Sequence, residues 1–211
     1  MSTAKAKPDS PWKDGFLFLG NHLALDFLNT CPAPNGEPLE LLPNFSALLR
    51  WFHAADLLTL RQRASLQGQW GDSARARRTV EAVRELRERI RKEVAAWEKD
   101  GVLHHSTVNE LNRLMAEHPM LTRLMTRGGK ASIELWFAPH QPEDLLAPLA
   151  HSAATLFARA DRNRVRKCTH CVLHFRDTSK KGTRRWCSMQ LCGNRQKVAA
   201  YAARRRSLDH E

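Results

Sequence analysis

The chain has 211 residues, of which 42% are hydrophobic, enough for one large domain or for a medium domain with a small module. This composition excludes a wholly disordered chain. No apolar run reaches the ~20 residues of a membrane-spanning helix, and the N-terminus carries no secretion signal. We therefore expect a cytoplasmic protein with no membrane partner.

The net charge of +12 is concentrated near the C-terminus. Residues 161–211 hold 14 Lys/Arg and 4 Asp/Glu, a net charge of +10, whereas the first 160 residues have a net charge of +2. This asymmetry favours a polyanionic partner, most commonly nucleic acid, over a merely solvated basic tail.

The N-terminal residues predict a leader followed by a β-hairpin. Residues 1–14 are rich in Lys, Pro and Ser and predict a flexible leader. Two β-prone runs, Phe16–Leu19 and His22–Leu28, flank Gly20-Asn21 and predict strands joined by a turn. Residues 31–43 contain four prolines and predict a loop.

Amphipathic patterns then predict helices separated by one strand. We expect helices capped by Asn44, over about 56–66, over 73–99 before Gly101, over about 107–117, and from Pro142 to about Phe157. Alternation over Ala131–Phe137 predicts a strand that pairs with the N-terminal hairpin. The expected fold class is α+β, with a mainly helical domain over 15–160 and a small module over 161–211.

The C-terminal module carries four cysteines with the spacing of a metal site. Cys168 and Cys171 have two residues between them, and Cys187 and Cys192, fifteen residues later, have four. Such pairs typically bind zinc, because a tetrahedral ion needs four ligands and each pair supplies two thiolates. We predict one structural Zn²⁺, since four thiolates close its coordination shell.

Other interpretations of these cysteines are weaker. A redox-active pair lacks its βαβ context, a histidine ligand such as His170 or His174 is unnecessary, and a catalytic zinc keeps a ligand position open. Metal-free thiols remain an alternative. Cys31 has no partner nearby in the sequence and is expected to be a buried thiol.

The residues between and after the cysteines predict a treble-clef finger. We expect a strand over 172–177, a turn over 178–182, a returning strand over 183–186 and a helix over 188–206, with Leu191 and Val198 on its core side. The candidate nucleic-acid contacts are the following: Arg176, Lys180, Lys181, Arg184, Arg185, Asn194, Arg195, Lys197, Arg204 and Arg205. Trp186, beside a zinc ligand, is expected in the core.

The sequence resembles a known family at both ends. Trp186-Cys187-Ser188, the tetrapeptide Cys192-Gly193-Asn194-Arg195 and the basic helix after it resemble the CGNR zinc finger. The stretch from Leu25 to Thr30 (LDFLNT) is similar to the ABATE domain, which precedes that finger in bacterial proteins described as stress-induced transcription regulators. The resemblance implies the same four zinc ligands, an α/β N-terminal domain and DNA binding.

We therefore expect a non-enzymatic, DNA-binding transcription regulator whose N-terminal domain senses a ligand or partner. An RNA-binding protein and a protein-interaction adaptor that uses the finger as a rigid support are the alternatives, and homodimer formation stays open. Asp26 and Asn29 could line a regulatory ligand site, although short polar side chains more often bind nearby backbone.

Overall fold

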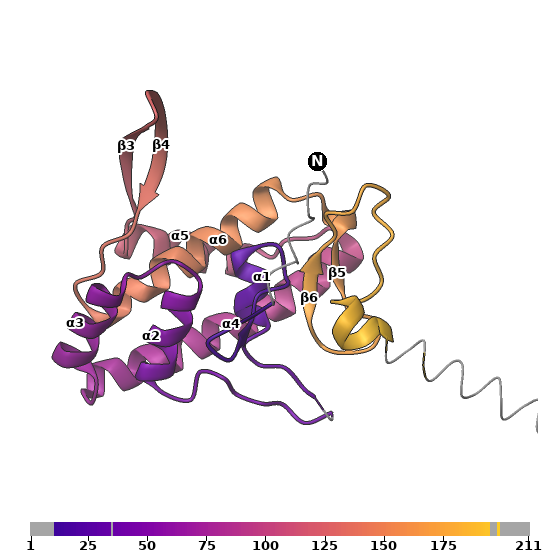
Figure 1. Ribbon diagram of the computed structural model, residues 1–211, viewed down its shortest axis with the longest axis horizontal. Helices are drawn as coiled ribbons and strands as arrows, with labels where there is room; N and C mark the ends of the chain where they lie inside the picture. Colours follow the sequence, from indigo (N-terminus) through magenta and orange to yellow (C-terminus); the bar gives the residue numbers. More distant parts are fainter. Residues whose placement is uncertain (1–10, 35, 195–197, 199–211) are drawn as a thin grey trace, which may run out of the picture.

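The computed structural model describes residues 11–34, 36–194 and 198 (Figure 1). Its α-helices are α1 (Leu23–Leu28), α2 (Phe45–Ala54), α3 (Leu60–Trp70), α4 (Ala74–Asp100), α5 (His105–Glu117) and α6 (Leu146–Arg159). The strands form antiparallel pairs: β1 (Trp12–Lys13) with β2 (Phe16–Leu17), β3 (Leu121–Arg127) with β4 (Lys130–Trp136), and β5 (Val165–Lys167) with β6 (His174–Arg176). Shorter helical turns are η1 (Pro142–Leu145), η2 (Arg162–Arg164) and η3 (Met189–Gly193). The predicted fold class, a mainly helical chain with small antiparallel sheets, is confirmed.

Local capping chemistry explains where two of the helices begin and where α4 ends. The Asn44 side chain accepts the amide of Ala47 at the start of α2, and Ser73 accepts the amide of Ala76 at the start of α4. Gly101, with φ of +72°, ends α4 in the left-handed conformation that glycine adopts without steric cost. None of the helices in the described ranges has both the length and the apolar character that a membrane crossing needs.

Two helices begin elsewhere than the sequence predicts. Helix α3 begins at Leu60 rather than near Asp56, because Asp56 has φ of +60°, and Thr59 and Gln62 form a capping box instead. Helix α5 begins at His105, upstream of the predicted capping box. The Thr107 hydroxyl donates to a carboxylate oxygen of Glu93 at 2.7 Å and so ties α5 to α4.

The predicted N-terminal hairpin is wrong in position. The turn consists of Asp14 and Gly15, whose φ values of +48° and +82° suit a two-residue hairpin, so residues 12–13 of the expected leader form β1. Residues 23–28, predicted as a strand, form helix α1. Five of its six residues are buried. An apolar run that is buried on nearly every side does not distinguish helix from strand.

Helix α1 lies at the centre of the main core. It contacts α4, α6 and β6, and Phe27 on α1 packs against Trp51 of α2 with ring centroids 5.7 Å apart. Trp51 also contacts Phe18 and Phe52 through its ring, and its own side chain is fully buried. The aromatic cluster therefore joins the segment after β2, α1 and α2 into one body.

The strand predicted over Ala131–Phe137 is present as β4, but its predicted partner is wrong. It pairs along its whole length with β3, from Leu121 opposite Trp136 to Arg127 opposite Lys130. The β3–β4 hairpin projects from the helical body at the end remote from the C-terminal module (Figure 1).

The C-terminal module also differs from its predicted topology. Strand β6 pairs with β5, which lies in the polar segment before the first cysteine, and residues 183–186 form no strand. The buried carboxylate of Asp177 explains the difference, because it accepts the amides of Ser179 and Arg184 at 2.9 and 2.8 Å. These bonds hold the 178–184 segment as a loop.

Candidate metal centre

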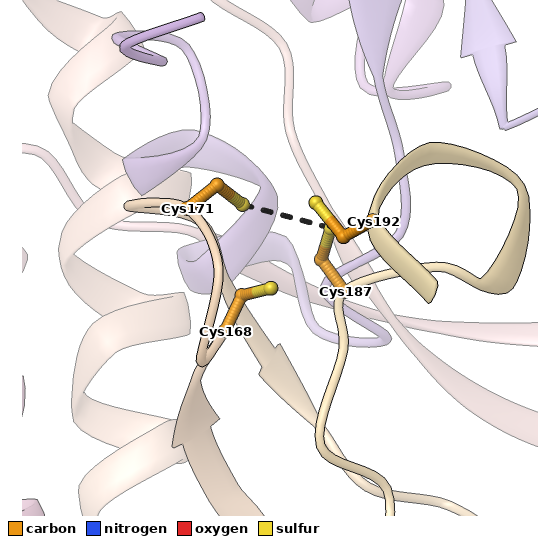
Figure 2. Close-up of side chains that lie close together, drawn as sticks. All are labelled: Cys168, Cys171, Cys187 and Cys192. Atoms are coloured by element: carbon orange, nitrogen blue, oxygen red, sulfur yellow. Dashed lines mark hydrogen bonds between the residues drawn. The ribbon is translucent and has the colours of Figure 1, made fainter. Parts of the chain in front are cut away.

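Each cysteine of the module is positioned by a short, well-bonded segment. Cys168 follows β5, and its amide donates to the carbonyl of Leu173 at 2.8 Å, which closes the turn that carries Cys171. Cys187 follows the loop from Asp177. Cys192 lies on η3, whose first amides are accepted by the hydroxyl of Ser188. Figure 2 shows the four side chains pointing toward one another from these three segments.

The four sulfur atoms have the spacing that a tetrahedral zinc ion requires. All four lie within 4.8 Å of one another. The Sγ atoms of Cys171 and Cys187 are 3.7 Å apart, and those of Cys187 and Cys192 are 3.5 Å apart. A tetrahedron with Zn–S bonds of about 2.3 Å has edges of about 3.8 Å. The cluster therefore fits one structural zinc ion held by Cys168, Cys171, Cys187 and Cys192.

Burial and charge also suit a closed site. Three of the cysteines are buried and Cys171 is half-buried. The hydrogen bond between the sulfurs of Cys171 and Cys187 lowers the pKa of Cys171 to about 5 and raises the pKa of Cys187. Burial raises the pKa of Cys192 to about 12. At neutral pH only one of these three thiols ionises readily, so metal binding must release protons.

One of the candidate DNA contacts, Arg184, is engaged inside the module. Its guanidinium lies 4.3 Å from the centroid of the Phe175 ring and donates to the carbonyls of Trp186 and Cys187. It thereby braces the loop that supplies a ligand and places a positive charge near the thiolates. Trp186 packs, as predicted, against the small core formed by Phe175 and the buried cysteines, but its side chain is only partly buried.

The remaining candidate DNA contacts differ in exposure. Lys180, Lys181, Arg185 and Asn194 are exposed, whereas Arg176 is half-buried in β6. Arg195, Lys197, Arg204 and Arg205 lie outside the described residues, as does most of the predicted helix. Val198, expected on the core side, is 68% exposed. The treble-clef assignment and the individual nucleic-acid contacts stay predictions.

The N-terminal body contributes directly to the zinc module. Leu17 and Leu19 are buried in the same cluster as Phe175 and three of the cysteines. The amide of Arg176 donates to the carbonyl of Gly20 at 2.7 Å, and the Asn21 side chain donates to the carbonyl of Arg176 at 2.9 Å. The segment after β2 therefore lies along β6 and covers the module.

Asp26 and Asn29 hold this junction by binding backbone, as expected for short polar side chains. The Asn29 amide donates to the carbonyl of His174 at 2.9 Å, and its oxygen accepts the amide of His174 at the same distance. The backbone N–H and C=O of the buried His174 are thus both satisfied by the side chain of Asn29. A carboxylate oxygen of Asp26 accepts the amide of Gly20 at 2.7 Å.

An apolar groove of about 810 Å³ lies beside the metal centre. The loop after α1 supplies Pro32, Ala33 and Leu39 to one wall, and Val172 and Leu173 lie in the other with the cysteines. Cys31, which is half-buried, lies at the start of this loop and outside the cluster. The groove is a hollow between the N-terminal body and the zinc module.

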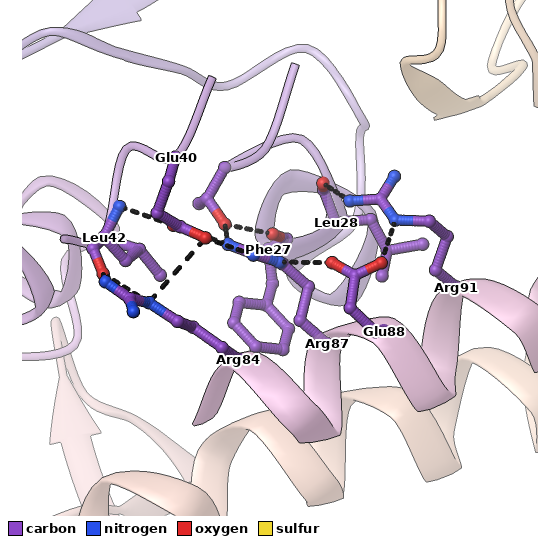
Figure 3. A network of polar contacts seen from close by, with 9 residues as sticks. Phe27, Leu28, Glu40, Leu42, Arg84, Arg87, Glu88 and Arg91 are labelled. Carbon is purple, nitrogen blue, oxygen red and sulfur yellow. Dashed lines mark hydrogen bonds and ion pairs between the residues drawn. The ribbon is translucent and has the colours of Figure 1, made fainter. Parts of the chain in front are cut away.

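A polar network fixes the loop that forms this groove (Figure 3). Arg87 on α4 is only 3% exposed and donates to both carboxylate oxygens of Glu40, at 2.9 and 2.5 Å, and to the hydroxyl of Thr30. Arg84 donates to the carbonyl of Leu42 through two nitrogens, at 2.9 and 2.6 Å. Two arginines one turn apart therefore hold both ends of the segment from Glu40 to Leu42.

Comparison with known families agrees with this geometry. The ABATE model, described as "Putative stress-induced transcription regulator", matches residues 21–160. The chain belongs to the ABATE family. The CGNR zinc finger model matches residues 164–205 of this ABATE protein, a range that contains all four cysteines. No curated protein matches the chain.

We predict that the purified protein contains one zinc ion per chain and that Cys187→Ser abolishes stoichiometric binding. Cys31→Ser is the matched control, because Cys31 lies outside the cluster and its removal should leave the zinc content unchanged. Affinity should fall as the pH decreases, because protons return to Cys187 and Cys192. Elemental analysis and titration with a chromogenic chelator measure both effects. Full zinc content in Cys187→Ser would contradict the assignment.

A second prediction concerns Asp26, whose pKa is raised to about 6 by burial despite hydrogen bonds from the backbone of Gly20 and Leu19. The folded state therefore binds this proton more tightly than the unfolded state, and stability decreases as the pH rises through about 6. Asp26→Asn keeps an acceptor for the Gly20 amide but carries no charge. It should raise the free energy of unfolding above pH 6 by about 3 kcal/mol, with a smaller gain near pH 4.

Denaturant unfolding of the variant and the wild type at each pH measures this difference. Zinc release at low pH largely cancels, because both proteins carry the same metal site. Asp72→Asn, at an exposed carboxylate, is the control and should leave stability nearly unchanged. A gain that does not vary with pH would show that Asp26 is not the titrating group.

Proposed function

We propose that this ABATE protein is a DNA-binding transcription regulator whose zinc-ordered module contacts the phosphate backbone. The observation that carries the proposal is a hollow of about 350 Å³ where the module meets the end of α4. Five of the residues that line it are cationic, against the single carboxylate of Glu98: Arg162, Arg166, Lys167, Arg184 and Arg185. A phosphate group suits such a site in charge.

The cations of the module divide into bracing and exposed groups. Arg164 donates to the carbonyl of Ser179 at 2.7 Å, and Arg166 donates to the carbonyl of Gly182 at 2.9 Å. These bonds hold both ends of the loop that presents Lys180 and Lys181 to solvent. A fixed loop brings its two ammonium groups to a phosphate backbone with a smaller loss of conformational entropy on binding.

The zinc ion supports this surface structurally when it is bound. Thr169, next to the ligand Cys168, donates from its amide and its hydroxyl to the carbonyl of Arg185, at 3.1 and 3.2 Å. The turn from Cys168 to Cys171 therefore fixes the backbone of the exposed Arg185. DNA binding would also agree with the cytoplasmic location expected from the sequence.

Neither matched family is described as an enzyme family, and we propose a non-catalytic role. RNA binding is the nearest alternative, since phosphate contacts do not distinguish the two polymers. A role as an adaptor would leave the exposed cations without function.

We further propose that the groove beside the metal centre is the sensing site and that it binds a small apolar molecule. Its volume lies in the range of ligand-binding pockets, and its walls come from both the N-terminal loop and the zinc module. A molecule bound there would contact both parts and could change how firmly they pack together.

The DNA-binding proposal predicts a salt-dependent affinity for duplex DNA. With about five phosphates neutralised, log K should fall with log salt at a slope of about −4 to −5. Replacing Lys180, Lys181 and Arg185 by Glu should weaken binding and reduce the magnitude of the slope by about three, since each exposed cation contributes ~0.9. Fluorescence anisotropy with labelled duplex measures both quantities.

The matched control replaces three exposed cations of the helices, Arg61, Arg78 and Lys92, by Glu and so changes the net charge equally. It should bind nearly as the wild type does. No duplex binding at low salt, or an equal loss in both variants, would contradict the proposal. Stronger binding of single-stranded RNA than of duplex DNA would favour the RNA alternative.

The groove proposal is tested with the uncharged apolar probe Nile red. Leu39 lines the groove and is 49% exposed, so Leu39→Arg should weaken probe binding by about tenfold without disturbing the fold. Val102→Arg, at an apolar residue of similar exposure outside the groove, is the control. Equal probe affinity in Leu39→Arg and the wild type would refute this site.

A further inference from the structure

The β3–β4 hairpin exposes apolar side chains that the helical body does not cover. Its strands pair only with each other among the described residues, and both of their outer edges are unpaired. The side chains of Leu124 and Ile133 are 70% and 74% exposed, and Leu135 is 49% exposed. A two-stranded ribbon is only marginally stable by itself, and large exposed aliphatic groups commonly mark an interaction surface.

The register places these aliphatic residues on one face. Residues directly opposite one another in an antiparallel pair point to the same side of the sheet, and alternate residues share that side. The uncharged face of the hairpin therefore consists of Thr122, Leu124, Thr126, Ala131, Ile133 and Leu135. The opposite face carries Arg123 and Glu134, and the Arg123 guanidinium lies 4.2 Å from the centroid of the Trp136 ring.

We infer that this uncharged face is a homodimer interface, in which the hairpins of two copies pack face to face across a two-fold axis. A two-fold contact brings each residue against residues of the same surface. A face that carries one sign of charge near the axis would repel itself, whereas this face holds only aliphatic and hydroxyl side chains. Its Leu and Ile side chains can fill the space between two such faces.

The size of the face sets the strength of the contact. A strand of seven residues is about 24 Å long, and two strands with their side chains are about 10 Å wide, so the face covers roughly 240 Å². This is well below the ~800 Å² that each partner of a standard stable complex contributes. The dimer is therefore weak, and we expect it only at high protein concentration.

The position of the hairpin leaves both zinc modules free in such a dimer. The hairpin and the module lie at opposite ends of the molecule (Figure 1). Two copies joined at their hairpins would present two cationic surfaces to one DNA duplex. Only this last consequence rests on the proposed function, because the self-association itself needs no DNA.

Sedimentation equilibrium of the full-length, zinc-loaded protein without DNA tests the inference, from about 1 µM to about 500 µM. We expect a monomer–dimer equilibrium in the wild type. Ile133→Lys should weaken the dimer at least tenfold, because it places two ammonium groups in the interface. Ser132→Lys adds the same charge at the neighbouring residue on the opposite face and should leave the dimer unchanged.

Circular dichroism and zinc content verify that both variants stay folded, which their high exposure favours. A wild type that remains monomeric at the highest concentration would overturn the inference, as would equal weakening by the two variants. The outcome is distinguishable from the DNA result. A dimer without duplex binding removes only the proposed function, and duplex binding by a strict monomer removes only the dimer.

Discussion

The convergence of four cysteine sulfurs on one point is the constraint on which the C-terminal module depends. The segments that carry them are a tight turn, a loop and a single helical turn, and the three-residue strands β5 and β6 are the only strands among the described residues of the module. So few regular hydrogen bonds would not hold these segments together without a metal or the support of a larger core. Bound zinc would supply the metal, and Leu17 and Leu19 extend the small core of the module.

Hydrogen bonds join the N-terminal body to the zinc module in addition to the apolar contacts of Leu17 and Leu19. Asn29 satisfies both backbone groups of His174, and Gly20 and Asn21 continue the contact to Arg176. Helix α1 thereby connects the aromatic core around Trp51 to the strand that precedes Asp177 and its loop. A short chain of direct contacts therefore connects α1 to the loop that carries Lys180 and Lys181.

The sequence predicts features whose causes are local. The four cysteines are recognisable because metal-binding turns have fixed spacings, and α2 and α4 are recognisable from Asn44, Ser73 and Gly101 at their ends. It misplaces the first hairpin because the Asp14-Gly15 turn adjoins a polar stretch that predicts a flexible leader. Strand β5 has no recognisable strand pattern because polar residues outnumber Val165, and the Asn29–His174 pair, 145 residues apart, leaves no local pattern.

The shared core of β2 and the zinc module has a consequence for how such proteins diversify. The boundary between the two family matches falls after residue 160, yet leucines from the opposite end of the chain occupy the interior of the second part. A gene fusion that joined this finger to an unrelated partner at that boundary would leave its interior without those leucines. A finger of this kind therefore needs a β2 segment that fits its interior, whichever domain it is joined to.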